Sequence, residues 1–327
     1  MLVEYMKIII DKIKLSPAFR KLVVFINSHF PVYMAKRRQK LYFNKEFDVN
    51  NPQDLNEKIL WLSLFTDTSE WTRLTDKYAV REYVKECGLE DILIPLYGHW
   101  DDPIKVDWDT LPRSFVLKSN NGASARTVKI VKDKNMLDIP EVTKEMGEWL
   151  NHKIGMETTE FHYLGIEPCI IAEQLLENDP ETAAYTSTLI DYKIWCFNGK
   201  AYAIWTCMNR NLDGAEVATF DKNWNYHPEG SVFNKDYKKQ PHLCPRPSCL
   251  EEMIEAAEKL SKPFPVVRVD LYCIGGKVYF GELTFTSNGG TNDFYTNEYL
   301  LEMGQQIDLS NVKKDRINKP GTIYEKR

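Results

Sequence analysis

A strand–turn–strand pattern near the C-terminus carries three charged residues and constrains the fold more than any other stretch of the chain. Residues 266–285 alternate apolar and polar side chains on either side of a turn at 274–277. Side chains two residues apart on a strand share a face, so Arg268 and Asp270 point together. Glu282 lies on the second strand. The pattern therefore predicts a β-hairpin with an arginine and two carboxylates on neighbouring strands.

The length of the turn decides whether the two carboxylates share a face. A two-residue turn at Gly275 and Gly276 would pair Val269 with Glu282 and would put Asp270 and Glu282 on opposite faces. A loop with an odd number of residues would bring them to the same side. If the carboxylates act together, we expect a three-residue turn with a glycine bulge.

Two carboxylates with open coordination positions suit Mg²⁺, which prefers a few carboxylates together with substrate phosphates and water. Arg268 would then stabilise negative charge that develops on a neighbouring oxygen. The spacing alone is equally compatible with a surface hairpin whose charges are solvated.

Composition narrows the class of protein. The 327 residues allow two or three domains with sizeable cores, and 43% hydrophobic with 27% charged residues is typical of a globular protein. Seven cysteines are scattered along the chain, which argues against a disulfide framework. We find neither an apolar stretch of about 18 residues nor a cleavable signal pattern, and we expect a cytoplasmic protein.

Basic residues are concentrated at the N-terminus. Residues 1–40 hold nine Lys/Arg against Glu4 and Asp11, although the whole chain has a net charge of −5. The remainder is therefore acidic, which argues against a broad nucleic-acid surface. Residues 1–50 read as helical, and we expect them to pack on their own body. The alternative is peripheral contact of residues 1–40 with the inner face of a membrane or with polysaccharide-synthesis proteins.

Hydrophobic periodicity and turn residues predict the remaining elements. Helices are expected from Asn56 onward and over 76–87, 139–152 and 251–260. Strands are expected over 92–94, 114–118, 127–131, 169–176, 189–197 and 201–206, with a hairpin turn at Asn198-Gly199. Residues 208–248 read as long loops around a short strand.

Charged residues end or interrupt three of these strands. Lys118 ends one, and the small polar loop 119–126 after it could lay backbone N–H groups on phosphates, or be only a flexible hairpin. Glu173 follows an apolar run, as exposed glutamates often do. Lys193 lies within an apolar strand and therefore needs an anionic partner or an open cleft.

Five groups of segments, taken in order, resemble the ATP-grasp superfamily and, more closely, the TupA-like ATP-grasp proteins of polysaccharide biosynthesis. The resemblance spans about residues 50–300. It is carried by Leu55-Asn-Glu-Lys-Ile59, by Asp76-Lys-Tyr-Ala-Val-Arg81, by Leu111-Pro-Arg-Ser-Phe-Val-Leu-Lys118 with Asn121-Gly-Ala-Ser124, by Asp191-Tyr-Lys193 with Phe197-Asn-Gly-Lys200, and by Arg268-Val-Asp270 with Phe280-Gly-Glu-Leu-Thr-Phe285.

The resemblance implies an α+β fold in which two ATP-grasp subdomains grip ATP, preceded by an N-terminal helical extension. The division that follows is 1–55 for the basic helical region, 56–112 for a segment before the ATP-grasp domain, 113–176 and 177–310 for the two subdomains, and 311–327 for a tail.

The resemblance also implies roles for individual residues, with ATP and Mg²⁺ as cofactors. Arg268 and Lys193 would be catalytic. Asp270 and Glu282 would bind the metal; many relatives have Asn where this chain has Thr284, so Asn288 is the candidate for a third ligand. The nucleotide would contact Lys77, Lys118, Asn121, Gly122, Ser124 and Lys193 through its phosphates, Glu173 and Leu175 through adenine, and Glu177 through ribose.

The chemistry typical of the family is ligation, in which ATP phosphorylates a carboxylate and an amine captures the acyl phosphate to give an amide. The resemblance implies carbohydrate carboxylate and amine substrates, such as a uronic acid of a capsular or cell-wall glycan and an amino acid. The alternatives are a glycosyltransferase, an ATP-dependent sugar phosphotransferase and a noncatalytic scaffold.

Overall fold

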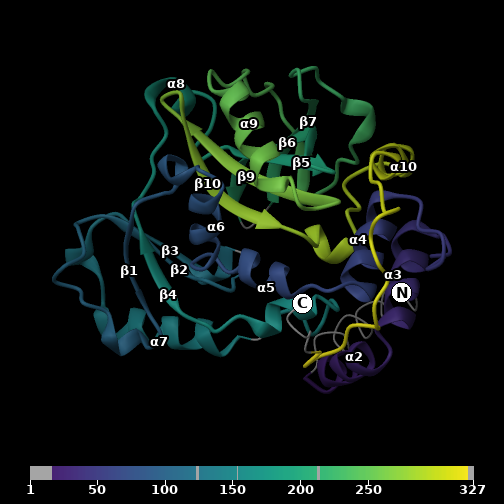
Figure 1. Ribbon diagram of the computed structural model, residues 1–327. Coiled ribbons are helices and arrows are strands. Elements are labelled where there is room, and N and C mark those ends of the chain that lie inside the picture. The colour runs from purple at the N-terminus through teal and green to yellow at the C-terminus, as the bar shows by residue number, and fades with distance from the viewer. Residues whose placement is uncertain (1–16, 123–124, 153, 212–213, 323–327) are drawn as a thin grey trace, which may run out of the picture.

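Two antiparallel-rich sheets face each other across the middle of the molecule in a computed structural model (Figure 1). The structure describes residues 17–122, 125–152, 154–211 and 214–322. Within them one sheet has four strands and the other has six, and each sheet has its own cluster of buried apolar side chains. The predicted α+β class is confirmed.

The smaller sheet has the order β1(Leu96–Trp100), β4(Ile170–Glu173), β2(Phe115–Ser119), β3(Val128–Val131), with antiparallel pairing throughout. Helix α7(Ile139–Asn151) covers one face through Val142, Met146 and Trp149. Asp138 caps this helix by accepting a hydrogen bond from the Glu141 amide, and Pro140 follows in the first turn, where no amide donor is needed. The sheet takes its edge strand β1 from the 56–112 segment.

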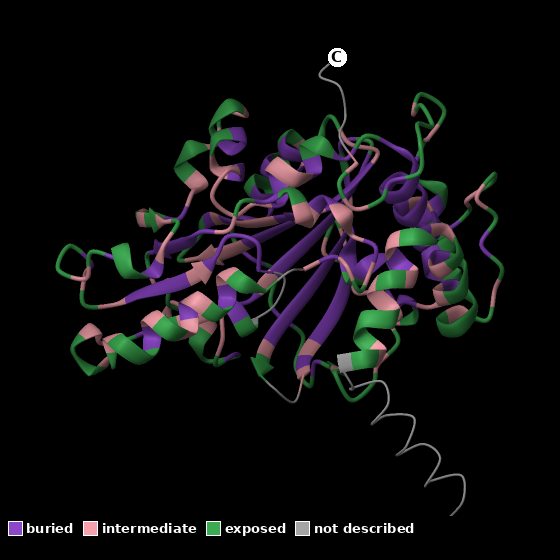
Figure 2. Ribbon diagram, turned by 90° about the horizontal axis from the view of Figure 1, so that it is seen from below, coloured by how far each residue is buried: buried purple, intermediate pink, exposed green. Residues whose placement is uncertain are grey.

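The larger sheet has the order β10-β9-β5-β6-β7-β8. Its strands are β5(Asp191–Phe197), β6(Lys200–Asn211), β7(Gly214–Asp221), β8(Tyr237–Lys239), β9(Val266–Ile274) and β10(Lys277–Thr284). Helix α9(Leu250–Ser261) packs on one face through Met253, Ala257 and Leu260. Burial follows the central strands of the sheet (Figure 2). The opposite face is therefore the one available to polar groups.

Further helices lie between and beside the sheets: α4(Leu55–Phe65), α5(Ser69–Thr75), α6(Val80–Glu86), α8(Pro180–Ala183) and α10(Asn297–Gln305). Helix α4 is buried along almost its whole length and begins with a capping box between Asp54 and Glu57. Short 3₁₀ turns occur at Glu90–Ile92, Pro103–Lys105, Ala125–Thr127, Lys134–Met136, Phe161–Gly165, Pro228–Gly230 and Ser287–Gly290.

The N-terminal extension forms two helices, α2(Pro17–His29) and α3(Pro31–Phe43). Pro31 opens α3, and Asn44 ends it in a left-handed conformation with φ 51°. Ala35 and Gln39 are buried, so α3 packs against the body as expected. Residues 1–16 of the predicted helical region lie outside the described residues. In the part of the chain that is described, no helix has the length and apolar character needed to cross a bilayer.

The hairpin β9–β10 brings the two carboxylates together by a different device from the one predicted. The turn has two residues, Gly275 and Gly276, because Ile274 pairs with Lys277; the prediction of a three-residue turn is wrong. The register shifts instead between Phe280 and Glu282, so that Glu282 pairs with Asp270. The extra residue is Gly281, and this β-bulge supplies the odd count that puts both carboxylates on one face.

Three other predictions about secondary structure are wrong. The strand predicted over 92–94 is displaced to β1, and Glu90–Ile92 forms a 3₁₀ turn. The helix predicted over 76–87 is confined to α6. Residues 208–248 contain the end of β6 and the eight-residue strand β7 as well as the short β8. Strand β7 pairs with β6, the strand directly before it, and β8 pairs in parallel with β7.

The bulge should tolerate no side chain at Gly281. A Cβ added there would lie 2.9 Å from the Asp270 carbonyl oxygen. We expect Gly281→Ala to lower the free energy of unfolding by about 1–3 kcal/mol, because backbone must move to admit the methyl group. Urea unfolding measures this change. The matched control is Gly147→Ala inside α7, where an added Cβ meets nothing within 4 Å and a gain of about 0.5–1 kcal/mol is expected. Unchanged stability in Gly281→Ala would contradict the bulge.

Candidate active site

A row of four side chains crosses the polar face of the larger sheet. Strand register pairs Trp205 with Lys193, Lys193 with Asp270, and Asp270 with Glu282. Directly paired residues on one face lie close together, so β6, β5, β9 and β10 each contribute one member. The two charged motifs at Asp191–Lys193 and Arg268–Asp270 therefore meet in space.

Asp270 is the centre of a buried ion cluster. It accepts a hydrogen bond from the Lys193 ammonium and two from Arg268, at 2.7 Å from Nε and 2.8 Å from Nη2. Arg268 also donates to the Ser287 hydroxyl at 2.7 Å and to the Thr284 hydroxyl at 3.2 Å. Lys193, Arg268 and Asp270 are all buried. The anionic partner that Lys193 needed is thus Asp270, and the Arg268 fork is fixed on both sides.

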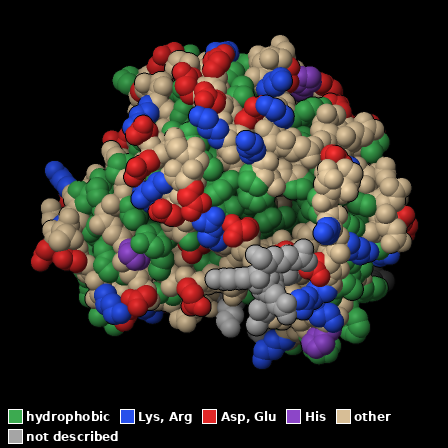
Figure 3. All heavy atoms as spheres, viewed as in Figure 1, with side chains coloured by type: hydrophobic (Ala, Val, Ile, Leu, Met, Phe, Trp, Pro, Cys, Tyr) green, Lys and Arg blue, Asp and Glu red, His purple; other side chains and the backbone are tan. Residues whose placement is uncertain are grey.

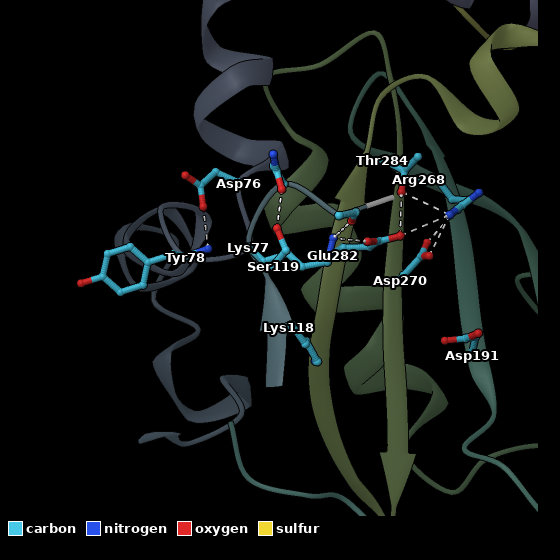
Figure 4. Close-up of polar contacts among 12 residues, drawn as sticks. Asp76, Lys77, Tyr78, Lys118, Ser119, Asp191, Arg268, Asp270, Glu282 and Thr284 are labelled. Atoms are coloured by element: carbon cyan, nitrogen blue, oxygen red, sulfur yellow. Dashed lines mark hydrogen bonds and ion pairs between the residues drawn. The ribbon is translucent and has the colours of Figure 1, made fainter. Parts of the chain in front are cut away.

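Lys77 joins this cluster from the other half of the molecule. Its ammonium lies 3.2 Å from Glu282 Oε2 and donates to the Gly122 carbonyl. Its backbone amide donates to the Asn120 carbonyl at 3.0 Å. Figure 4 shows Lys77, Glu282, Asp270 and Arg268 converging, with Lys118 and Asp191 to either side. The loop after β2 and the strand β10 are therefore linked through one lysine.

Positive charges outnumber negative charges in the cluster. Burial by itself raises the pKa of Glu282, but Lys77, Lys193 and Arg268 outweigh it and lower that pKa to about 2. Burial lowers the pKa of Arg268, and Asp270 and Glu282 more than reverse this. With Asp191, 3.9 Å from Lys193, and its partner Arg210 included, four cations face three carboxylates. The surplus positive charge suits an anionic ligand.

The residues expected to contact the adenine and ribose of ATP lie at the end of β4. Glu173 is buried and accepts from Lys118 at 2.8 Å and from Arg81 at 3.1 Å. Leu175 is half-buried and Glu177 is exposed. In this structure Lys118 is therefore paired with Glu173 and not with the Asp270 cluster.

The remaining predicted site residues are more dispersed. Asn121 is buried and accepts a hydrogen bond from the Ser119 hydroxyl, and Gly122 follows it. Ser124 lies outside the described residues. Asn288 is exposed and donates to the Thr291 carbonyl at 2.6 Å and to Asp293 at 3.2 Å.

A pocket of about 690 Å³ opens over the cluster. Lys193, Arg268 and Glu282 belong to its lining, together with the aromatic side chains of Tyr42, Tyr163, Trp205, Tyr237 and Phe294. Hydroxyl and amide groups also face it, from Thr158, Thr284, Thr286, Ser287, Asn288 and Thr291. Aromatic faces and many hydrogen-bonding groups beside a cationic floor suit a polar, ring-containing ligand.

The N-terminal helices hold two loops of this pocket. Arg38 of α3 donates to the Thr158 carbonyl and to the Thr159 hydroxyl, and Asn27 of α2 donates to the Glu157 carbonyl at 2.7 Å. Gln39 donates to the Gly290 carbonyl at 3.2 Å. No local sequence pattern indicates these contacts, because they join residues more than 100 positions apart.

Two further residues that lie in or beside the pocket were not predicted from the sequence. Arg210 lies 2.9 Å from Asp191 and extends the row of charges along β6. Tyr163 lies near Glu160 and the cluster, and burial raises its pKa, with Glu160 and Glu282 adding to the effect. The charged Asp191 at the start of an apolar strand was a signal that a distant cation was required.

The protein side chains can supply only part of a metal ion's coordination, and a bound ligand and water would have to supply the rest. Within the described ranges no three His, Cys, Asp or Glu side chains are grouped so that they could hold a metal ion. Asp270 and Glu282 are two carboxylates side by side, which fits Mg²⁺ when phosphate oxygens and water complete its octahedron.

A family model described as TupA-like ATP-grasp matches residues 57–308. The chain belongs to the TupA-like ATP-grasp family. The predicted resemblance and the ATP-grasp fold are thereby confirmed, and the protein is an ATP-grasp enzyme. The matched residues begin after α2 and α3, so the family model does not cover the helices that hold the pocket loops.

Solved structures with a similar fold include two D-alanine–D-alanine ligases. The ligase from Bacillus anthracis is 17% identical, with a TM-score of 0.46 over 75% of this TupA-like chain and 70% of that chain. The ligase from Helicobacter pylori is 14% identical, with a TM-score of 0.42 over 78% and 67%. A sequence comparison with curated proteins gave no match.

The low pKa of Glu282 predicts an acid-dependent loss of stability. In the folded protein this pKa is about 2 instead of 4.5. The unfolded state therefore binds the proton first as the pH falls, so the stabilisation is present above the unfolded pKa and is lost towards about pH 2. We expect Glu282→Gln to be less stable than wild type near neutral pH, and the difference to shrink on acidification.

Urea unfolding at several pH values measures this difference. Because Lys77 is the strongest of the three stabilising cations, the pH-dependent part should decrease when Glu282→Gln is compared in a Lys77→Met background. A difference that stays constant with pH would contradict the assignment.

Proposed function

We propose that this ATP-grasp ligase joins an amine, such as an amino acid, to a uronic acid during synthesis of a capsular or cell-wall polysaccharide. One observation carries the proposal: Lys193 and Arg268, with Lys77 ion-paired to the neighbouring Glu282, make a cationic floor for a pocket with aromatic and hydroxyl-bearing walls. Such a pocket suits a sugar carboxylate beside the group that activates it.

ATP would lie between the two sheets. Lys118 would leave Glu173 for the phosphates, and Glu173 and Leu175 would meet adenine at the end of β4. The exchange is electrostatically balanced, because Glu173 keeps Arg81 at 3.1 Å when Lys118 moves. Lys77 and Lys193 would likewise turn from carboxylates to phosphate oxygens.

Mg²⁺ would be held by Asp270 and Glu282 together with ATP oxygens, and it would supply neutralisation of phosphate charge. Lys77 and Lys193, which now help to neutralise these carboxylates, would be available to the transferred phosphoryl group. Asn288 would need to give up its hydrogen bonds to Thr291 and Asp293 to become a third ligand.

Arg268 would act on the reacting carboxylate. Its fork is held by Asp270, Ser287 and Thr284, so it meets developing oxyanion charge without having to reorganise. Lys193, fixed beside it, would align the carboxylate oxygen with the γ-phosphoryl group. The carboxylate oxygen attacks phosphorus and ADP leaves; the amine nitrogen then attacks the acyl carbon, loses a proton, and phosphate leaves.

Hydroxylamine provides a direct test that needs no knowledge of the natural amine. The protein is incubated with Mg-ATP, hydroxylamine and pools of uronic acids, and ADP and product mass are followed. An acyl phosphate gives a hydroxamate, which is the expected result. A phosphorylated sugar with ADP, and no hydroxamate, would instead indicate a sugar phosphotransferase and would overturn the ligase proposal. Each uronic acid that gives a hydroxamate is then tested with pools of amines in place of hydroxylamine.

Asp270→Asn tests the site. The substitution keeps the shape of the side chain but removes the charge that partners Arg268 and Lys193 and that would hold the metal. We expect kcat to fall by about 10²–10³-fold, with the fold retained by circular dichroism. Asp101→Asn, in an exposed ion pair with Lys105, is the control and should be fully active. Full activity in Asp270→Asn would remove the metal assignment.

Arg210→Gln tests the substrate pocket. Arg210 is 46% exposed and lines the pocket wall, so it can bind the carboxylate or a hydroxyl of the substrate. Losing a charge-assisted hydrogen bond should raise KM for the carboxylate by about 10–100-fold with a smaller change in kcat. The matched control is Arg246→Gln, which is 45% exposed and ion-paired with Glu251 but lies in another pocket. Equal effects of the two variants would contradict the pocket assignment.

A further inference from the structure

The helices α2 and α3 have an outward face unlike the rest of the molecule. Residues 17–43 contain six Lys/Arg and no Asp or Glu, in a chain whose net charge is −5. Figure 3 shows Lys and Arg side chains gathered over the region where Figure 1 places these helices. The surface is therefore locally basic on an otherwise acidic protein.

Large apolar side chains lie among these charges. On α2, Leu22 and Phe25 are 53% and 54% exposed; on α3, Tyr33 and Leu41 are 56% and 75% exposed. Phe30, between the helices, is also exposed. Water contact with so many large apolar groups in two short helices is unfavourable, and such a grouping marks an interaction surface.

Helical spacing puts the two kinds of side chain on one face of α3. Tyr33, Lys36, Arg37, Lys40 and Leu41 are exposed and follow the i, i+3, i+4, i+7, i+8 pattern of one helix face. The opposite face of α3 is the one with Ala35, Arg38 and Gln39, which packs on the body and holds the pocket loops. Among the described residues, the charged side chains of this outward face make one ion pair, an exposed one between Lys40 and Glu46 at 3.2 Å.

We propose that the outward face of α2 and α3 docks on an anionic membrane surface. Lys and Arg would meet lipid headgroups, while Phe, Tyr and Leu enter the interfacial region. An amphipathic basic helix is stabilised there both by electrostatic attraction to anionic lipid and by burial of its apolar side chains. Docking here would leave the substrate pocket one helix away from the bilayer. The inference goes beyond the ligase activity and does not depend on it.

Two other occupants fit the charges less well. A second copy of this chain, docked by a two-fold axis, would bring Lys36 and Arg37 against their own counterparts and repel. A nucleic acid would satisfy the cations but would leave Leu22, Phe25 and Leu41 without an apolar partner, since its affinity comes from phosphate contacts. An anionic bilayer interface offers partners to both the cations and the apolar side chains.

Sedimentation of the full-length protein with vesicles tests the proposal. Vesicles of phosphatidylglycerol and phosphatidylcholine in equal parts are compared with vesicles of phosphatidylcholine alone. We expect binding to the anionic vesicles only, weakened by salt. Lys36→Gln with Arg37→Gln should weaken it by about 25-fold, from about fivefold for each charge lost near the surface. Phe25→Ser with Tyr33→Ser should also weaken it.

Matched controls come from the other end of the molecule. Lys132→Gln with Lys144→Gln removes two exposed cations, and Ile104→Ser with Met136→Ser removes two exposed apolar groups. Neither should change vesicle binding. Circular dichroism verifies the fold of each variant.

Three outcomes would overturn the proposal: no binding of the full-length protein to anionic vesicles, equal weakening by the control pairs, or a dimer in solution that the Phe25→Ser, Tyr33→Ser variant abolishes. Binding to an RNA oligonucleotide without binding to vesicles would identify a nucleic-acid surface instead. Because sedimentation needs no turnover, a failed ligase assay leaves this result interpretable.

Discussion

The architecture depends on a cluster of opposite charges held on one face of a sheet. Lys193, Arg268 and Asp270 are buried, and burying charges is unfavourable unless they are paired closely. The strand register meets this condition by setting Lys193 opposite Asp270 and Asp270 opposite Glu282. A ligand rich in phosphate can replace carboxylates as partner of the cations, so the cluster is both a structural requirement and a site poised for exchange.

The cluster also joins the two halves of the protein. Lys77 reaches Glu282 from the segment that precedes the smaller sheet, and its backbone is bonded to the loop after β2. Arg38 and Gln39 reach the pocket from the N-terminal extension. The pocket over the cluster is therefore assembled from parts of the chain within and outside the family's matched region.

Several features could be predicted from the sequence because they are local. Asn198-Gly199 specified a two-residue hairpin turn, and the pairing of Phe197 with Lys200 confirms it. Alternation in residues 266–285 specified the β9–β10 hairpin. The family motifs identified the ATP-grasp fold. The roles of the individual site residues stay predictions, since no ligand tests them.

Other features could not be predicted because they depend on partners distant in sequence. The turn at Gly275-Gly276 kept its preferred length, and the carboxylates were brought together by the bulge at Gly281, which the strand pattern does not distinguish from an ordinary strand residue. Strand β7 was read as loop for a different reason: it pairs with β6, the strand directly before it, but the polar residues around it resemble a loop. The contacts of Arg38 with Thr158 and Thr159 depend on partners about 120 residues away.

The sequence by itself determined which chemical groups this protein has: an arginine, two lysines and two carboxylates on strands, within the motifs of an ATP-grasp ligase. Side-chain alternation and turn residues encode such information in neighbouring positions. Only the tertiary structure decided that Asp270 faces Glu282, that Lys77 closes the cluster, and that α3 turns one face to the pocket and a basic, apolar face outward. Strand register and packing between distant segments set those relations.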